Sequence, residues 1–372
     1  MNDQLLDLYS DYLISSFGQA SATRLAELLG GSISHDKITR FLSSQLRTSA
    51  DLWKIVKPLV RQIQQVQSQS EAQAQEEEDA LIVDDSIAEK PYTDVNDIVC
   101  WHYDHSTDRQ VKGINFLTAL YHSHSQAEEG ISLPVGFALV AKTERYIDKK
   151  DGKEKRRSPI SKNEHYRSLL QQAVNNQVPF GYVLNDVWYA SAENMKFVKH
   201  TIKKDFIMPI KANRKVALSL KDKQQGRYVR VESLVLEPNA SYEVYLEGID
   251  FPLMLVKQVF VNEDGSRGIL YLLTSNTTLT YDEITTIYRK RWNVEQYHKS
   301  LKQNASLEKS PTQTVVTQTN HFFAALCAYI KLEMLRVSTK LNHFALKSKL
   351  YLNALQVTFL TLQEMQPVRL AA

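Results

Sequence analysis

The feature that most constrains the fold of this chain is a series of strand and helix patterns between residues 80 and 213. Short runs rich in β-branched and aromatic residues alternate with longer segments of helical periodicity, and they predict three strands, a helix, a strand, a helix and a strand. They cover residues 80–90, 113–123, 131–143, 162–177, 180–186, 190–203 and 206–213. This order predicts an α/β fold whose sheet presents ligand-binding residues at the carboxyl ends of its strands.

The order of these elements is that of the ribonuclease H-like fold, and two further regions extend it. A basic loop is expected at residues 147–157. Residues 214–275 read as successive strands with a hairpin turn at residues 262–266, which predicts an all-β insertion. Helical patterns resume at residue 281 and continue toward the end of the chain. The sequence therefore predicts a ribonuclease H-like core interrupted by an all-β insertion and followed by a helical C-terminus.

The first 60 residues have helical periodicity and contain a pattern for two short helices. The first is expected at Thr23–Leu29, Gly30 and Gly31 break it, and Ser34 caps the second. The second helix is expected to expose four side chains and to bury three: His35, Lys37, Thr39 and Arg40 against Ile38, Phe41 and Leu42. This pattern resembles a helix-turn-helix, whose second helix would enter a major groove, although short helix pairs also occur in proteins that bind no DNA.

The segment of residues 62–79 is rich in Gln and then acidic, which predicts the end of a helix and a solvated linker. We therefore expect four regions along the chain. They are an N-terminal helical DNA-binding domain with its linker at residues 1–78, the first part of the core at 79–213, the insertion at 214–275, and the completion of the core with C-terminal helices at 276–372.

Composition excludes several classes of protein. Cys100 and Cys327 are the two cysteines of the chain, so neither a disulfide framework nor a cysteine-rich zinc site is expected. No run of about 18 uncharged apolar residues occurs, and no charged segment precedes an apolar run at the N-terminus. We expect a cytoplasmic protein that does not enter a membrane.

The net charge of +3 hides two regions of opposite sign. Residues 71–97 contain ten acids and one lysine, a balance of −9, whereas residues 196–230 contain eleven basic residues and two acids, a balance of +9. Each run can be a solvated face. A basic stretch together with a cluster of carboxylates also suits a metal-dependent enzyme that acts on nucleic acid.

Two of the predicted strands end in carboxylates. Asp84 and Asp85 follow the apolar run Leu81–Val83, and only one of them can face a site on a given side, because neighbouring side chains of a strand point to opposite faces. Asp186 closes the fourth strand of the core. Each acid can instead cap the turn that follows it, and Asn185 can replace Asp186 as the polar contact. Acids at the ends of two strands nevertheless favour a shared site.

A third group of polar residues lies on a helix that is predicted over residues 281–303. Its members are separated by three, four and seven residues and form one stripe of that helix. They are Tyr288, Arg291, Glu295 and Lys302, with Lys299 one turn after Glu295. A surface helix with an Arg291–Glu295 ion pair would show the same spacing, but Tyr288 and Trp292 are large for a solvated helix.

The pattern Tyr288-x2-Arg291-x3-Glu295-x6-Lys302, after two strand-end aspartates, resembles the Y-R-E-K signature of bacterial insertion-sequence transposases of the Asp-Asp-Glu type. In that family the catalytic domain carries a β-strand insertion. Residues 272–303 are similar to the third conserved block of the family, and residues 33–42 are similar to the N-terminus of one subgroup. The resemblance covers roughly residues 80–310.

The resemblance implies a DNA transposase that binds the end repeats of a transposon, cleaves phosphodiester bonds and transfers the strands to target DNA. Asp85, Asp186 and Glu295 would be catalytic and would hold two divalent cations, Mg²⁺ or Mn²⁺. Asp85 is preferred to Asp84 because the catalytic aspartate of the family directly precedes a Thr or Ser, which is Ser86 here. Carboxylate oxygens are hard ligands, as magnesium requires.

Further residues are implied to contact DNA. They are Tyr288, Arg291, Trp292, Lys299 and Lys302 near the cleaved end, and Lys37, Thr39 and Arg40 on the reading helix. Trp292 would either support a distorted DNA end or pack into the core. The implied partners are double-stranded DNA, as transposon ends and target, and a second copy of the chain in a homodimeric DNA complex. The implied location is the nucleoid of a bacterial cytoplasm.

Three other functions stay open. A host nuclease or resolvase on the same fold would not need the insertion or the N-terminal DNA reader. A catalytically silent regulator derived from a transposase would not need three intact carboxylates. A glycosidase would use a pair of acids, but no aromatic or Gly-rich segment near these acids suggests a sugar cleft.

Overall fold

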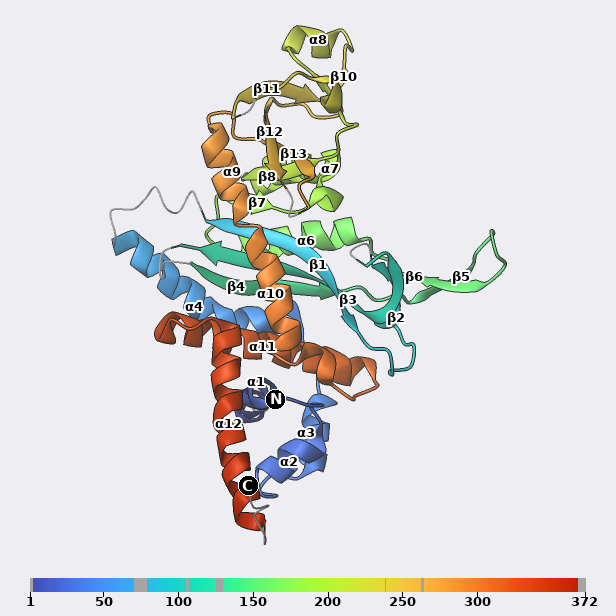
Figure 1. Cartoon of the computed structure of the whole chain (residues 1–372). Helices are drawn as coiled ribbons and strands as arrows, with labels where there is room; N and C mark the ends of the chain where they lie inside the picture. The colour runs from blue at the N-terminus through green and yellow to red at the C-terminus, as the bar shows by residue number, and fades with distance from the viewer. Residues whose placement is uncertain are drawn as a thin grey trace. The chain divides into compact units, whose positions relative to one another are not determined.

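The computed structural model describes residues 3–69, 79–104, 107–124, 130–237, 239–261 and 264–366 (Figure 1). The chain divides into two compact units. Unit 1 comprises Met1–Thr48, Ile87–Ile114 and Tyr297–Ala372, and unit 2 comprises Ser49–Ser86 and Asn115–Gln296. Most of the predicted linker, the acids at residues 71–78 and the first half of the predicted turn at 262–266 lie outside the described residues. No helix among the described residues is long and apolar enough to cross a membrane.

Unit 1 is mainly helical. Its elements are α1 (Asp3–Ser15), α2 (Ala22–Leu28), α3 (His35–Leu42), β2 (Val99–Asp104), the 3-10 turn η4 (Leu307–Lys309), α11 (Val315–Thr339) and α12 (His343–Met365). Three further elements have residues in both units: β1 (Ala80–Glu89), β3 (Arg109–Ser123) and α10 (Trp292–Gln303).

The two short N-terminal helices confirm the sequence prediction. The side chain of Ser34 caps α3 by accepting a hydrogen bond from the backbone N–H of Lys37. Gly30 and Gly31 both have positive φ between the helices, a backbone conformation that glycine adopts without strain. The predicted faces are also correct, because Ile38, Phe41 and Leu42 are buried and the four polar side chains of α3 are exposed.

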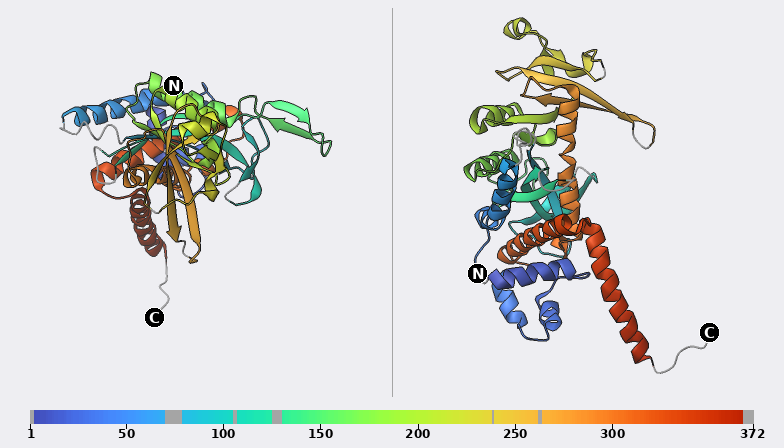
Figure 2. Two further views of the ribbon diagram at one scale, coloured as in Figure 1. Left: turned by 90° about the horizontal axis from the view of Figure 1, so that it is seen from above. Right: turned by 90° about the vertical axis from the view of Figure 1, so that its left-hand side faces the viewer.

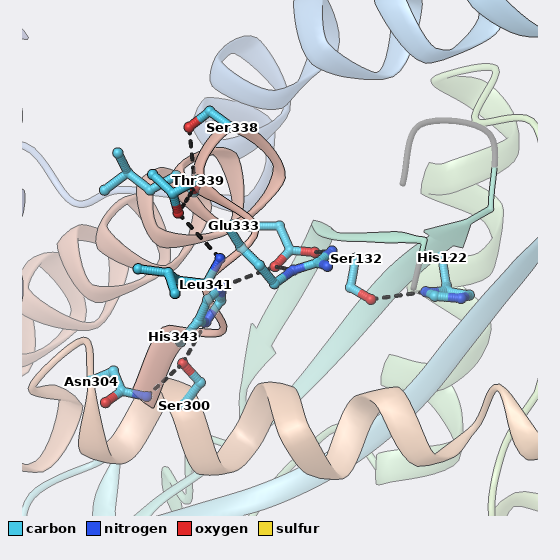
Figure 3. A network of polar contacts seen from close by, with 11 residues as sticks. His122, Ser132, Ser300, Asn304, Glu333, Ser338, Thr339, Leu341 and His343 are labelled. Carbon is cyan, nitrogen blue, oxygen red and sulfur yellow. Dashed lines mark hydrogen bonds and ion pairs between the residues drawn. The ribbon is translucent and has the colours of Figure 1, made fainter. Parts of the chain in front are cut away.

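Helix α11 forms the centre of unit 1, and side chains from the N-terminal helices bond to it. Tyr9 of α1 lies 3.0 Å from the ring of His321, and Asn320 donates to the backbone oxygen of Leu42 at the end of α3. At its other end, Glu333 is paired with His343 of α12 at 2.9 Å, as Figure 3 shows. Buried polar side chains of this kind fix how the helices pack, because each must find its partner.

Unit 2 is built on a mixed sheet. Its further elements are α4 (Ser49–Gln69), β4 (Ile131–Leu139), β5 (Glu144–Ile147), β6 (Glu154–Arg157), α6 (Lys162–Asn175), β7 (Tyr182–Leu184), η1 (Val187–Tyr189), α7 (Ala192–Lys196), η2 (Phe197–Ile202), β8 (Asp205–Ile210), β9 (Lys215–Ala217), α8 (Leu220–Gln224), β10 (Val229–Arg230), η3 (Val231–Ser233), β11 (Ser241–Leu246), β12 (Leu253–Val261), β13 (Arg267–Thr274) and α9 (Tyr281–Arg289). The strands follow the order β10-β9-β11-β12-β13-β8-β7-β1-β3-β4.

The central strands β1, β7 and β8 of this sheet are parallel, and their apolar side chains form the core. β1 pairs with β7 and β7 with β8 in parallel, while β3 and β4 are antiparallel. Their apolar side chains, including Leu81, Val183 and Ile207, have no exposed surface, as expected for strands covered on both faces. Helix α4 packs on this core, since the hydroxyl of Ser49 accepts the backbone N–H of Phe137 in β4. The predicted domain boundaries stay predictions, although α4 belongs to unit 2 and not to unit 1.

The segment predicted as an all-β insertion continues the same sheet, because β13 pairs antiparallel with β8. The β12–β13 hairpin extends past its neighbours (Figure 2), with pairs running from Met254↔Thr274 to Val261↔Arg267. The prediction of an all-β segment is wrong in one respect, since helix α8 lies within it. Residues 227–236, predicted as a strand, form only the two-residue β10 and the turn η3 before the chain continues to β11.

Two strand regions were not expected from the sequence. β2 pairs with the first half of β3 in unit 1. The predicted basic loop at residues 147–157 is wrong in part, because β5 and β6 form a hairpin there and only residues 148–153 form its turn. Acids pair with basic residues across this hairpin, Arg145 with Glu154 and Arg157 with Glu144, in exposed ion pairs that add modestly to its stability.

Candidate functional site

Strands β1 and β7 bring aspartates together in unit 2: Asp84 and Asp85 lie in the middle of β1, and Asp186 follows the end of β7. The two strands run in register, with Ala80 opposite Tyr182 and Ile82 opposite Leu184. Asp84 and Asp85 therefore follow Ile82 at the level where Asp186 follows Leu184. The acids of the two predicted strands therefore lie close enough to interact, but the prediction that Asp84 and Asp85 end their strand is wrong, because β1 continues to Glu89.

Asp186 also caps the turn η1, which was the simpler role considered for it. Its Oδ1 accepts the backbone N–H of Trp188 at 2.9 Å. Burial raises the pKa of Asp186; the Trp188 N–H opposes this rise and the carboxylate of Asp85 adds to it. Asn185 is fully buried and structural, because it accepts the Tyr166 hydroxyl at 2.8 Å and donates to the backbone oxygen of Asp186.

Asp85 is held by three donors. Its Oδ2 accepts Lys162 Nζ at 2.6 Å and Asn115 Nδ2 at 3.2 Å, and its Oδ1 accepts the Tyr189 hydroxyl at 2.5 Å. Burial alone would raise the pKa of Asp85, but the charge of Lys162 and the three hydrogen bonds lower it. The surroundings therefore stabilise Asp85 as an oriented carboxylate.

Asp84 has other partners. Its Oδ1 accepts the backbone N–H of Asp85 at 2.9 Å, and its Oδ2 lies 4.0 Å from Arg291 Nη1. Burial and then the carboxylates of Asp186 and Asp85 raise its pKa well above the usual value, and Arg291 only partly offsets this. The two neighbours thus bond to different groups, as expected for a strand. The choice of Asp85 as the catalytic member stays a prediction.

The third acid-bearing segment is two helices, so the prediction of one continuous helix over residues 281–303 is wrong. Helix α9 ends at Arg289 and α10 begins at Trp292. Between them the chain makes tight i→i+3 bonds, from Lys290 to Ile287 and from Arg291 to Tyr288. Tyr288 therefore belongs to α9 and Glu295 to α10, and Arg291 lies at the junction.

Arg291 connects this junction to the acids of the sheet. Its Nη1 lies 3.2 Å from Glu295 Oε1, in addition to its contact with Asp84. The Tyr288 hydroxyl donates weakly to the backbone oxygen of Asn185 at 3.4 Å. The structure thus brings Tyr288, Arg291 and Glu295 to the acids in the middle of β1 and beyond the end of β7. Trp292 is 59% exposed, so of its two expected roles, packing into the core is wrong.

The remaining predicted DNA contacts lie in unit 1. Lys299 Nζ is 5.1 Å from the centre of the Phe344 ring, and Lys302 Nζ is 3.9 Å from Glu308 Oε1. Lys37, Thr39 and Arg40 are exposed on α3. These side chains are available at the surface or paired only loosely, and their contact with DNA stays a prediction.

Sequence reasoning missed the three side chains that hold Asp85. Lys162 is the first residue of α6, Tyr189 ends the turn η1, and Asn115 lies in the apolar strand β3. Asn115 carried a usable signal, because a polar residue between Ile114 and Phe116 in a buried strand must find a partner. The sequence around Lys162 and Tyr189 gave no such signal, apart from their positions at the ends of secondary-structure elements.

The cluster offers hard oxygen ligands of the kind that divalent cations prefer. Besides the carboxylates, Asn115 Oδ1 is buried without a hydrogen-bond partner among the described residues. Within the described part of the chain, however, no three His, Cys, Asp or Glu side chains are arranged to hold a metal ion. Lys162 and Arg291 are bonded to the carboxylates instead. The residue types fit a divalent cation, which would have to displace these basic side chains from the carboxylates.

Two models of protein families match the chain. The model described as DDE superfamily endonuclease matches residues 2–232, which is over half of the chain, and the model described as Transposase DDE domain matches residues 159–331. Together the two stretches contain all the acids of the cluster. A search of curated proteins found no match.

Proposed function

Because the chain belongs to the DDE superfamily of endonucleases, we propose that it is an insertion-sequence transposase with a β-strand insertion and the Y-R-E-K signature. It would bind the end repeats of its transposon, cleave there and join the strands to target DNA. The observation that carries this proposal is the gathering of acids from β1, β7 and α10 around Arg291. The order β4-β3-β1-β7-β8 of the central strands supports a ribonuclease H-like core.

Asp85, Asp186 and Glu295 would hold two divalent ions, Mg²⁺ or Mn²⁺. When bound, such a pair activates the attacking oxygen and stabilises the leaving oxygen of a phosphodiester. Asn115 and Tyr189 keep the Asp85 carboxylate in one orientation. The Trp188 N–H does the same for Asp186.

The basic and aromatic side chains would position the DNA. Arg291 presents a planar guanidinium that suits a phosphate near the acids, and the Tyr288 ring lies 6.0 Å from it. Trp292 is exposed beside Arg291 and would stack on a distorted DNA end. Lys299 and Lys302, further along α10, would contact more distant phosphates.

Sequence recognition is assigned to α3, where Lys37, Thr39 and Arg40 are exposed on a capped helix. A second copy of the chain would join the DNA complex. Helix α12 offers a surface for it, because Leu352, Leu355, Phe359 and Leu362 are exposed at the three- and four-residue spacing of a coiled coil. Residues 350–363 carry no charge. Action on chromosomal DNA would place the protein at the bacterial nucleoid.

One observation favours a second candidate, a catalytically silent DNA-binding regulator. The carboxylate of Asp85 is already bonded to an ammonium group, and a regulator would keep it so. Both candidates bind DNA, but only the transposase cuts it.

The experiment uses a plasmid carrying the gene with its native flanking DNA. The purified protein with Mg²⁺ or Mn²⁺ should cut at the element ends and produce joined strands. Ca²⁺ should allow binding with little cleavage, because its looser coordination poorly supports the two-metal geometry. Specific binding without any cleavage, in every divalent cation, would favour the regulator. Full cleavage in excess chelator would contradict the metal-dependent mechanism.

A further inference from the structure

Among the described residues, Lys162 is the one basic side chain bonded to Asp85, and nothing in the family signature assigns it a role. Its ammonium lies 2.6 Å from Asp85 Oδ2. The contact joins Lys162 at the start of α6 to Asp85 in the middle of β1, 77 residues away in the chain. Lys162 thus binds an oxygen of Asp85, the residue that the proposed function assigns to holding a divalent ion.

The three donors on Asp85 differ in how firmly they are fixed. Tyr189 is fully buried and stacks on Tyr166 with ring centres 5.1 Å apart. Asn115 is buried in the middle of β3. Lys162 is about one-third exposed and has a flexible four-carbon side chain at the first position of a helix. Only the lysine can leave without disturbing the packing of the core.

We propose that Lys162 is a built-in counter-cation that competes with the divalent ion for Asp85 and moves away when the ion binds. The proposal rests on the proposed function, since it concerns the same site. Tyr189 and Asn115 remain in place and keep the carboxylate oriented for the ion. Lys162 is therefore a positioning residue that sets the metal affinity of the site.

Competition and simple structural support predict opposite results for metal binding. If Lys162 competes, its removal frees an oxygen of Asp85 and metal affinity rises. If Lys162 only supports the fold, its removal weakens the site or leaves it unchanged. Loss of Tyr189 should weaken affinity under both views, because an oriented ligand loses a supporting hydrogen bond.

The test is a titration of the full-length protein with Mn²⁺ alone, following free Mn²⁺ by electron paramagnetic resonance. Lys162→Met should lower the apparent Kd by about tenfold or more, since a charge-assisted hydrogen bond no longer opposes the ion. Lys162→Arg keeps the charge and should stay near the wild-type Kd. Tyr189→Phe should raise the Kd by about tenfold.

Lys199→Met is the matched control. Lys199 pairs with Asp205 at the same 2.6 Å in the same unit, so its loss removes an equal ion pair outside the cluster and should leave the Kd unchanged. Thermal melts check that each variant is folded. Wild-type protein that binds Mn²⁺ with the same or higher affinity than Lys162→Met would overturn this proposal alone. Absence of Mn²⁺ binding in both would overturn it together with the proposed function.

Discussion

Two regions of unit 2 contain a lysine–aspartate pair of the same length, and they are not equivalent. Lys162 meets Asp85 in the middle of β1, and Lys199 meets Asp205 at the start of β8. Asp85 lies among other carboxylates, whereas the further partner of Asp205 is the hydroxyl of Ser275 at 2.6 Å. The length of an ion pair therefore does not identify a site. The surrounding charges identify it, because the carboxylates near Asp85 carry more negative charge than one lysine can neutralise.

The largest expected difference between the two regions is in catalysis. Asp85→Asn, Asp186→Asn and Glu295→Gln should each reduce DNA cleavage by about 10³-fold or more, because residues that act as a unit fail together. Asp205→Asn should leave the rate within about twofold, since it removes one partly exposed ion pair. Single-turnover cleavage at saturating Mg²⁺ measures both.

End binding by the same variants is the control, and it should be nearly unchanged. An Asp85→Asn protein that still cleaves beside an inactive Asp84→Asn protein would reverse the assignment of the β1 acid.

Arg291 should give the next largest effect. Arg291→Ala removes a cation that contacts Asp84 and Glu295, and it should lower the cleavage rate by about 10²-fold. The free energy of unfolding should fall by more than the ~1 kcal/mol typical of an exposed pair, because the Arg291 side chain is only 19% exposed and its loss leaves the largely buried Asp84 without this cation. The salt dependence of end binding should also flatten by about one unit of slope.

Lys302→Ala is the companion to Arg291→Ala. Lys302 lies about 10 Å along α10 from Glu295, since a helix rises about 1.5 Å per residue, and it should contact DNA and not the metals. It should therefore weaken end binding more than it slows the chemistry. Wild-type cleavage and unchanged salt slopes in both variants would leave only a surface ion-pair helix.

A pH-dependent effect on stability is expected at Asp84. Its raised pKa means that the folded state disfavours the charged carboxylate, so stability falls as pH rises from the ordinary aspartate range through the raised value. Asp84→Asn keeps the acceptor for the Asp85 N–H and removes this penalty. In chelator, the variant should melt at a higher temperature than the wild type near neutral pH. The difference should vanish below about pH 4, where both side chains are neutral. A variant that is less stable at every pH would contradict this.

The smallest effect should come from the second ion pair. Lys199→Met should cost less than about 1 kcal/mol, because partly exposed pairs contribute little to stability. Chemical denaturation with and without Mn²⁺ measures it. A stabilisation by Mn²⁺ that differs from the wild type would mean that the two regions are coupled, and the comparison would fail.

Local patterns predicted what depends on neighbours in the chain. The apolar run before Asp84 and Asp85 correctly predicted a buried strand, because burial depends on consecutive residues, but the strand does not end at these acids and continues to Glu89. The cap at Ser34 and the faces of α3 were correct for the same reason. The order of strands and helices along the chain also predicted a mixed α/β fold, which the structure shows.

Contacts between distant residues were not predictable in this way. Tyr189 and Asn115 are 104 and 30 residues from Asp85, and no local pattern records that they meet. The break between α9 and α10 was missed because residues 281–303 contain no Gly or Pro. Tertiary contacts of Arg291 at the junction outweigh the local helical preference there. The hairpin β5–β6 was not predicted because its many charged residues are typical of a solvated loop.

The pairing of β13 with β8 has a consequence for shortening this protein. β8 is an apolar strand whose Phe206, Ile207 and Met208 are fully buried, and β13 covers the backbone along one of its sides. Deleting the whole segment from β9 through β13 would leave the apolar strand β8 with an open edge. Such an edge recruits other chains into aggregates. Trimming restricted to β9, β10 and α8 would leave that edge protected. A minimal version of the protein should therefore keep β12 and β13 even when their remote end is dispensable.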